Sequence, residues 1–212
     1  MTLAPRESEE ERHWTIEDYR SLDDEERYEV LEGRLIMVPA PTMPHQQVIT
    51  ELGTLINGYV RDTGAGICFH APFDVYLSKD TVVQPDFSFV TEERREEVLR
   101  HHGAIGAPDL VIEVLSPSTA SRDRGEKRSI YAQAGVNWLL LVDPEGLTVE
   151  VFRLDEAGRY TWMDTASGVQ TLTFGLFPEL SIDLQKIWPE ERLEEWKEEV
   201  SEGEEKEEGD KE

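Results

Sequence analysis

Three charged residues of this sequence, Asp86, Glu113 and Lys127, occupy positions where a charge is costly. Asp86 follows a proline within a run of β-branched and aromatic residues, and Glu113 is in the middle of the apolar run LVIEVL. A carboxylate in such a run is either desolvated, at a cost on the order of several kcal/mol, or has a cation beside it. Lys127, on a segment with helical periodicity, could be that cation. Two acids and a lysine, brought together by two strands and a helix, are what metal-dependent hydrolysis of a phosphodiester needs.

Each of the three residues also has a simpler structural interpretation. Asp86 could be a surface residue at a strand end. Because it alternates with two phenylalanines, however, its side chain should point to the face of the strand opposite to theirs. Glu113 could face water from an edge strand, but apolar residues on both faces of its strand favour a covered strand. Lys127 could pair with Asp123 at spacing i, i+4, a contact worth roughly a few tenths of a kcal/mol. Lys127 could make this ion pair and also take part in a functional site.

Two further sets of residues are weaker candidates. His45 shares a helical stripe with apolar residues, and a lone histidine in a helix is more often a satisfied structural residue than a ligand. Glu29 and Glu32 lie in or beside an expected hairpin. Taken alone, each is more often a solvated surface residue than a functional one.

Hydrophobic periodicity and turn residues predict the elements that must position these side chains. Helices are expected over residues 14–19, 45–61, 121–134 and 191–200, with a polar helical segment outside the core over 91–102. Strands are expected over 67–77, 82–90, 109–115, 137–142, 148–154 and 159–163, after a hairpin from Arg27 to Val38 that turns at Glu32 and Gly33. This order predicts an α/β or α+β sandwich.

Length and composition favour a single domain. The chain has 212 residues, which suggests one domain over residues 14–188, a disordered acidic N-terminus over 1–13, and a short amphipathic helix with an acidic disordered tail over 189–212. The single cysteine excludes an intramolecular disulfide and a cysteine zinc site. Neither a signal-type segment nor an apolar run of membrane-spanning length is present, so we expect a cytoplasmic protein without a membrane partner.

The net charge of −25 is large and concentrates at the two ends. Residues 190–212 hold 13 acidic and 4 basic residues, and residues 1–29 hold 11 acidic and 4 basic residues. Nucleic-acid-binding proteins normally carry a basic patch, and this chain has only short basic stretches such as Arg94-Arg95. The charge is therefore the strongest argument against a role on DNA.

The chain nevertheless resembles a known family. The segments YEVLEGRLIMVPAP, QPDFSFV, GAPDLVIEVLSPST and YAQAGVNWLLLVDP, together with His45 and the pair of Asp123 and Lys127, are similar to the Uma-type family of restriction-endonuclease-like proteins. That family is part of the PD-(D/E)xK nuclease superfamily and is common in bacteria. The resemblance covers Trp14 to Leu184. It implies a restriction-endonuclease-like core with a central mixed β-sheet flanked by helices, an extra N-terminal hairpin and extra C-terminal strands.

The resemblance also implies roles for particular residues. Asp86 matches the aspartate of the PD motif, Glu113 the acid of (D/E)xK, Glu29 a glutamate of the family's hairpin, and His45 a histidine at the start of the following helix. The chain departs from the superfamily pattern at Leu115, where a lysine would stand. The resemblance therefore implies that Lys127 supplies the ammonium group from a helix.

The mechanism implied by these matches is metal-dependent hydrolysis of DNA. Asp86 and Glu113, with a backbone carbonyl near Val114, would hold Mg²⁺ or Mn²⁺ through oxygen ligands. Lys127 would orient the attacking water or stabilise charge on phosphorus. Glu29 or His45 could bind a second ion or shape the pocket. A homodimer is also implied, because many endonucleases of this fold cut two strands as dimers.

Two other classes of protein remain open from the sequence. One is a nuclease-derived binding or regulatory protein without turnover, which the excess of acid favours because a polyanion repels DNA. A basic protein partner could then bind the acidic tail. The other is a structural sandwich in which the charges form a buried network.

Overall fold

The computed structural model describes residues 12–23 and 26–209, and the N-terminal segment expected to be disordered lies mostly outside them. The helices are α1 (Ile16–Arg20), α2 (Met43–Thr63), α3 (Arg95–Val98), α4 (Ala120–Arg122), α5 (Arg128–Ala134) and α6 (Glu190–Gly209), and there are shorter helical turns η1 (Glu92–Arg94), η2 (Asp123–Lys127) and η3 (Leu184–Lys186). No helix in these ranges is both long and apolar enough to cross a bilayer.

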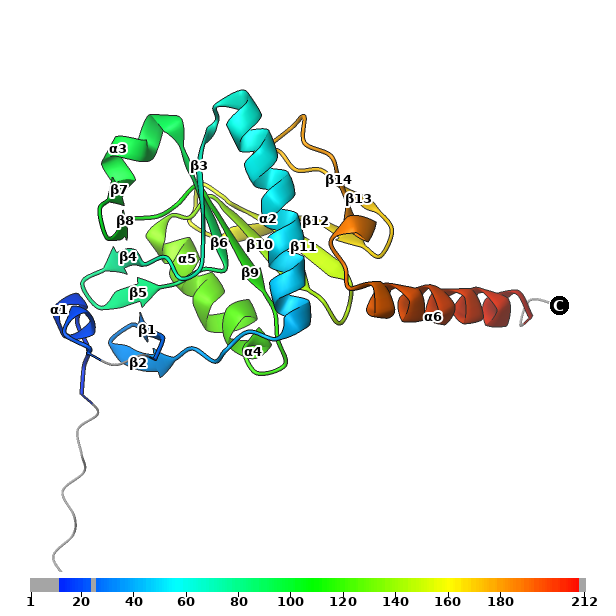
Figure 1. The fold of residues 1–212 in the computed structure, drawn as a ribbon, viewed down its shortest axis with the longest axis horizontal. Coiled ribbons are helices and arrows are strands. Elements are labelled where there is room, and N and C mark those ends of the chain that lie inside the picture. Colours follow the sequence, from blue (N-terminus) through cyan, green and yellow to red (C-terminus); the bar gives the residue numbers. More distant parts are fainter. Residues whose placement is uncertain (1–11, 24–25, 210–212) are drawn as a thin grey trace, which may run out of the picture.

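The central sheet has six strands in the order β12-β11-β10-β9-β6-β3 (Figure 1). Its strands are β3 (Gly66–His70), β6 (Phe87–Thr91), β9 (Leu110–Val114), β10 (Trp138–Asp143), β11 (Thr148–Leu154) and β12 (Tyr160–Ser167). β9 and β10 are parallel and the other neighbours are antiparallel. Helix α2 crosses one face, and α4 to α5 lie on the other (Figure 1). The expected mixed sheet flanked by helices is confirmed.

A second six-stranded sheet, in the order β2-β1-β5-β4-β8-β7, contains the N-terminal hairpin. Its strands are β1 (Tyr28–Leu31), β2 (Arg34–Met37), β4 (Val75–Ser78), β5 (Thr81–Val83), β7 (Leu99–Arg100) and β8 (Gly103–Ile105). The hairpin turns at Glu32 and Gly33 as predicted, with both residues at positive φ. The extra C-terminal strands include a separate pair, β13 (Thr171–Leu172) and β14 (Ile182–Asp183).

Two predicted strands were wrong in their extent, because each is divided between the two sheets. Residues 67–77 form β3 in the central sheet and β4 in the second sheet, and residues 82–90 form β5 and β6 in the same way. Pro72 lies at the first division and Pro85 at the second. Proline has no N–H to donate to a sheet ladder, so it interrupts pairing at these points. Alternating hydrophobicity cannot reveal that a strand changes sheet.

The remaining differences concern shorter segments. The helix expected over 121–134 contains a π-helical turn, η2, between α4 and α5. The segment 91–102 was expected to be helical and outside the core. It is helical only over η1 and α3, continues as strand β7, and contains the buried Val98. Helix α6 begins as predicted but extends to Gly209, and so includes much of the segment expected to form an acidic tail.

The central sheet has an apolar cluster on each face. On one side, α2 residues pack with Phe87, Phe89 and Ile112, and with apolar residues after β12. On the other side, Val111 and Leu115 pack with α5 and with residues of the second sheet. Because both faces of β9 are covered, Glu113 is in a buried strand, as its apolar neighbours predicted.

Candidate active site

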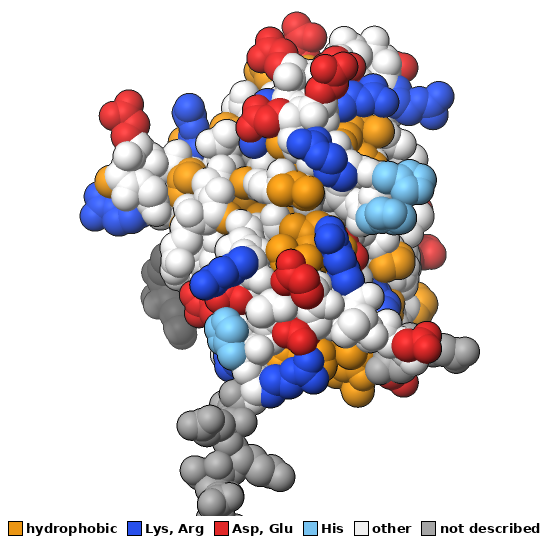
Figure 2. All heavy atoms as spheres, turned by 90° about the vertical axis from the view of Figure 1, so that its left-hand side faces the viewer, with side chains coloured by type: hydrophobic (Ala, Val, Ile, Leu, Met, Phe, Trp, Pro, Cys, Tyr) orange, Lys and Arg blue, Asp and Glu red, His pale blue; other side chains and the backbone are white. Residues whose placement is uncertain are grey.

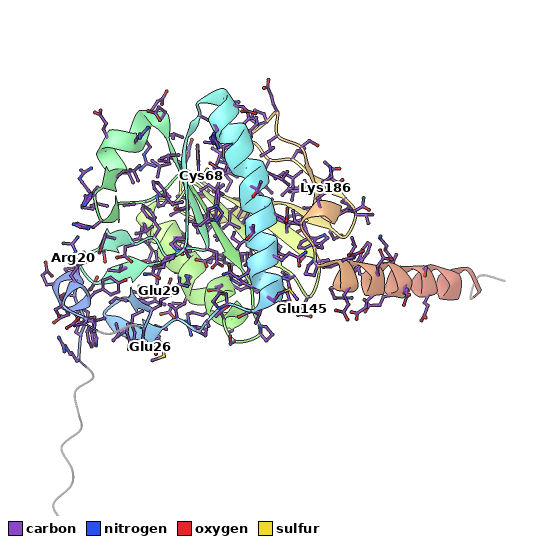
Figure 3. The ribbon with its side chains drawn as sticks, in the orientation of Figure 1. Arg20, Glu26, Glu29, Cys68, Glu145 and Lys186 are labelled. Atoms are coloured by element: carbon purple, nitrogen blue, oxygen red, sulfur yellow. The ribbon has the colours of Figure 1, made fainter. Side chains whose placement is uncertain are left out.

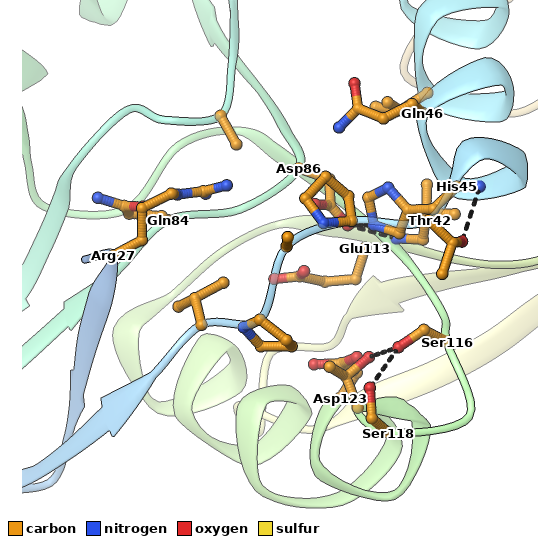
Figure 4. Close-up of a pocket in the computed structure, with 18 of the residues that line it drawn as sticks. Arg27, Thr42, His45, Gln46, Gln84, Asp86, Glu113, Ser116, Ser118 and Asp123 are labelled. Atoms are coloured by element: carbon orange, nitrogen blue, oxygen red, sulfur yellow. Dashed lines mark hydrogen bonds and ion pairs between the residues drawn. The ribbon is translucent and has the colours of Figure 1, made fainter. Parts of the chain in front are cut away.

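A pocket of about 410 Å³ lies where the β1–β2 hairpin, the N-terminus of α2 and the turn after β9 meet (Figure 4). The five side chains predicted from the sequence all line it, together with the residue expected to offer a backbone carbonyl: Glu29, His45, Asp86, Glu113, Lys127 and Val114. They come from the second sheet, two helices and the central sheet. The fold therefore brings together every residue of the predicted site.

Local structure accounts for the position of each acid. Glu29 is in β1, and its side chain points inward from the hairpin (Figure 3). Asp86 follows Pro85, at the bend where the chain passes from the second sheet to the central sheet. Glu113 is the fourth residue of β9 and shares a face with Val111 and Leu115, next to α5. The acids therefore approach one point from both sheets.

Lys127 is the only buried cation among the described residues, with its side chain 5% exposed. Its Nζ lies 2.7 Å from Oε1 of Glu113, 3.0 Å from Oε1 of Glu29 and 3.9 Å from Oδ1 of Asp123. The i, i+4 pairing with Asp123 is thus present, as the longest of the three contacts. Lys127 ends the π-helical turn that begins at Asp123. Single π-helical turns occur frequently at functional sites.

Glu113 has a second partner that the sequence did not indicate. The hydroxyl of Tyr131, a fully buried residue of α5, donates a hydrogen bond to Oε1 of Glu113. Lys127 contacts the same oxygen. A tyrosine within an apolar helical stripe is indistinguishable from a core residue in the sequence.

Asp86 is held in a similar way. Its Oδ2 accepts a hydrogen bond from the backbone N–H of Val114 at 2.8 Å and lies 3.1 Å from Nε2 of His45 (Figure 4). His45 is buried at the start of α2, where Thr42 caps the helix. The other ring nitrogen of His45, Nδ1, is buried and has no partner among the described residues. His45 therefore orients Asp86.

The three acids share one feature at the level of atoms. Glu29 uses Oε1 for both Lys127 and the backbone N–H of Gln84, at 3.0 and 2.8 Å. In the part of the chain that the structure describes, no hydrogen bond reaches Oδ1 of Asp86 or the Oε2 atoms of Glu29 and Glu113. Each carboxylate thus has one oxygen fixed by the protein and one without a hydrogen bond.

Another buried acid gives the contrast. Asp109, also buried, accepts a hydrogen bond from Arg94 on Oδ1 at 2.8 Å. Its Oδ2 accepts from the N–H and hydroxyl of Thr91, at 2.9 and 3.1 Å. Both oxygens are satisfied, as expected for a purely structural acid. The half-satisfied acids occur in the pocket.

The electrostatics of the pocket are unbalanced toward acid. Burial raises the pKa of Glu113 well above its usual range, and Asp86, Asp123 and Glu29 raise it further, while Lys127 opposes the shift. Burial would lower the pKa of Lys127, but the surrounding carboxylates outweigh it and raise that pKa. Burial also raises the pKa of Asp123. A further cation would therefore be favoured in the pocket.

The donor set fits Mg²⁺ or Mn²⁺. Carboxylate oxygens and a backbone carbonyl are the hard ligands that these ions prefer, and Mg²⁺ usually keeps several waters and one or two protein carboxylates. Within the described ranges, no three His, Cys, Asp or Glu side chains are arranged to hold a metal by themselves. An ion here would accordingly need water to complete its coordination.

A family model described as "Putative restriction endonuclease" matches residues 16–185. Comparison with curated proteins gives no significant match. The fold is similar to the crystal structure of a putative nuclease belonging to DUF820 from Anabaena variabilis ATCC 29413, with a TM-score of 0.68 and 22% sequence identity. The match covers 85% of this chain and 99% of that one.

Proposed function

Because the chain belongs to the Uma2 family of putative restriction endonucleases, we propose that its pocket hydrolyses phosphodiester bonds of DNA with the help of Mg²⁺ or Mn²⁺. The observation that carries this proposal is the set of half-satisfied carboxylates around a buried lysine. Asp86 and Glu113 each keep one oxygen that accepts no hydrogen bond from the described residues, beside an ammonium group that stays protonated. A restriction-endonuclease-like fold supports the same reaction class.

Asp86 and Glu113, with the carbonyl of Val114, would hold the ion. When bound, it supplies polarisation of the phosphoryl oxygen and a bound water of lowered pKa. Lys127 donates hydrogen bonds to the attacking water or to an oxygen of the phosphate, and so stabilises the charge that develops there. Glu29 and His45 are positioning residues, since Glu29 fixes Lys127 and His45 fixes Asp86. Tyr131 fixes Glu113 in the same sense.

Plasmid cleavage tests the proposal. The full chain is incubated at low salt with Mg²⁺ or with Mn²⁺, beside Asp86→Asn, Lys127→Ala and Arg61→Ala. We expect metal-dependent nicking that falls about a hundredfold or more in the first two variants, the usual scale for losing a group that stabilises the transition state. Arg61 is exposed on the last turn of α2 and does not line the pocket, so its variant should cleave normally. Cleavage retained by Asp86→Asn, or no cleavage of either the plasmid or a single-stranded circular DNA with either metal, would refute the proposal.

The second candidate function is DNA or protein binding without turnover. The net charge of −25 favours it, since that charge repels a polyanionic substrate. Figure 2 shows acidic and basic side chains interspersed on one face of the molecule, without a continuous basic surface. In this case a basic protein could bind the acidic helix α6, and a homodimer is compatible with either function. Metal binding measured by calorimetry, without cleavage of any substrate, would favour this candidate.

A further inference from the structure

The pocket is lined by two arginine side chains in addition to Lys127. Arg27 and Arg122 both line the pocket and are partly buried. Neither makes a salt bridge with a described residue. Paired arginines are common elsewhere in the structure: Arg34 with Glu126, Arg94 with Asp109, Arg124 with Glu150 and Arg192 with Glu199. Arg27 and Arg122 are therefore not fixed by a carboxylate of the described chain, and their guanidinium groups can bind an anion that enters the pocket.

Arg27 is also held in place by a neutral group. Its Nε donates to Oε1 of Gln84 at 3.1 Å. The amide of Gln84 in turn donates to Oδ1 of Asp74 at 2.9 Å and to the hydroxyl of Tyr19 at 3.2 Å. This chain of contacts orients the guanidinium without neutralising it. No hydrogen bond to a described residue uses the two terminal nitrogens of Arg27. A guanidinium offers such donors in the planar arrangement that phosphate oxygens accept.

The position of Arg27 fits a ligand that extends beyond the reacting group. Figure 4 shows Arg27 and Gln84 on one side of the pocket and Thr42, His45 and Gln46 on the other, with Asp86 and Glu113 between them. Arg122 reaches the pocket from α4, immediately before Asp123. A phosphate at the carboxylates would therefore have neighbouring phosphates within a region that contains free guanidinium groups.

The size and depth of the pocket limit the ligand to one strand. Its volume of about 410 Å³ is in the range of pockets that enclose single small molecules. The side chains of Lys127 and Glu113 are each 5% exposed, so a scissile phosphate must enter the pocket to reach them. A single strand can bend a phosphate into such a pocket, and its lower charge density reduces repulsion by the acidic surface.

We propose that Arg27 and Arg122 bind phosphates that neighbour the scissile one, and that the pocket takes a single nucleic-acid strand. This inference rests on the proposed function, because it gives the same pocket a phosphodiester chain as its ligand. The two proposals can fail separately, because binding of phosphates by these arginines does not require hydrolysis.

The test is binding of a short fluorescein-labelled oligothymidylate to the full chain, measured by fluorescence anisotropy at several salt concentrations in the presence of a chelator. We expect Arg27→Ala and Arg122→Ala each to weaken binding about tenfold at low salt, the effect of losing one charge-assisted hydrogen bond. Each should also reduce the slope of log K against log salt by about 0.7, the share of one phosphate contact on a single strand. Arg27→Lys should keep most of that slope, because it keeps the charge.

The matched control is Arg61→Ala, which removes the same charge about 24 Å along α2 from His45. It should leave the slope unchanged. Equal slopes for Arg27→Ala, Arg122→Ala and wild type, or no binding by wild type, would overturn the inference. Tighter binding of a duplex of the same length would overturn its single-strand part. Arg27-dependent binding without any cleavage would refute the proposed function and leave the inference standing.

Discussion

Replacing Lys127 by methionine should destabilise the fold strongly near neutral pH. Methionine keeps an unbranched stem of similar length, so the loss of packing is small. The change leaves Glu113 and Glu29, whose side chains are 5% and 4% exposed, without the ammonium that lies 2.7 and 3.0 Å from them. Removing one partner of a buried ion pair typically costs about 3–5 kcal/mol. We expect a decrease of that size in the free energy of unfolding, measured by urea denaturation with tryptophan fluorescence.

The loss should depend on pH in a definite direction. Burial already raises the pKa of Glu113 in the folded state, and removing Lys127 removes the cation that opposes this shift. A carboxyl with a raised folded pKa contributes stability that is fully present below its unfolded pKa, about 4.3, and is lost as pH rises through the folded pKa. The stability that the wild type gains from the raised pKa of Lys127 is fully present throughout this acidic to neutral range, because it is lost only at a pH above that range. The destabilisation should therefore be smallest near pH 4 and grow toward pH 7.

Two comparisons isolate the charge. Lys186→Met removes an exposed lysine, 67% accessible and paired only at i, i+3, and should change stability by about 0.5 kcal/mol or less. Adding Glu113→Gln to Lys127→Met should restore part of the lost stability, because it removes an uncompensated charge. The reasoning is refuted if Lys127→Met costs no more than Lys186→Met, or if its cost is independent of pH.

Three further perturbations have defined outcomes. Burial raises the pKa of Cys68 to about 12, so iodoacetamide should alkylate it at pH 8 about a thousandfold more slowly than a free cysteine, and denaturant should abolish the difference. Gly103 has φ +143 and a Cβ there would lie 2.3 Å from the carbonyl oxygen of Asp74, so Gly103→Ala should lower the unfolding free energy by about 1–3 kcal/mol in urea titrations. Removing residues 201–212 should strengthen DNA binding at low but not high salt in anisotropy measurements, because salt screens the repulsion by their acids; unchanged low-salt affinity would exclude this repulsion.

Much of the fold could be predicted because its signals are local. The i, i+3, i+4 pattern of α2, the Glu-Gly turn of the hairpin and the apolar run of β9 all reflect periodicity or turn chemistry within a few residues. The division of residues 67–77 and 82–90 between two sheets could not be predicted in this way. A strand has the same alternation in whichever sheet it pairs.

Three of the candidate residues were also visible in the sequence, since a charge in an apolar run is conspicuous, whereas Glu29 and His45 were assigned only through the family resemblance. Glu113 and Asp86 were found for that reason, and Lys127 because it shares a helical stripe with apolar residues. Tyr131 could not be found, because its hydroxyl has a role only through its hydrogen bond to Glu113, 18 positions away. Arg27 was equally hidden, since its orientation depends on Gln84, 57 positions away.

The sequence by itself therefore determined which side chains are costly to bury and on which elements they lie. Only the tertiary structure decided which ion pairs and hydrogen bonds compensate the burial of these side chains. Lys127 and Glu29 are separated by 98 positions and approach to 3.0 Å, so their pairing is a property of two sheets and a helix packed together. The choice of which oxygen of each carboxylate receives a hydrogen bond depends on the same packing. Local propensity has no information about contacts at that range, and these contacts decide whether an acid is satisfied or remains available to a metal ion.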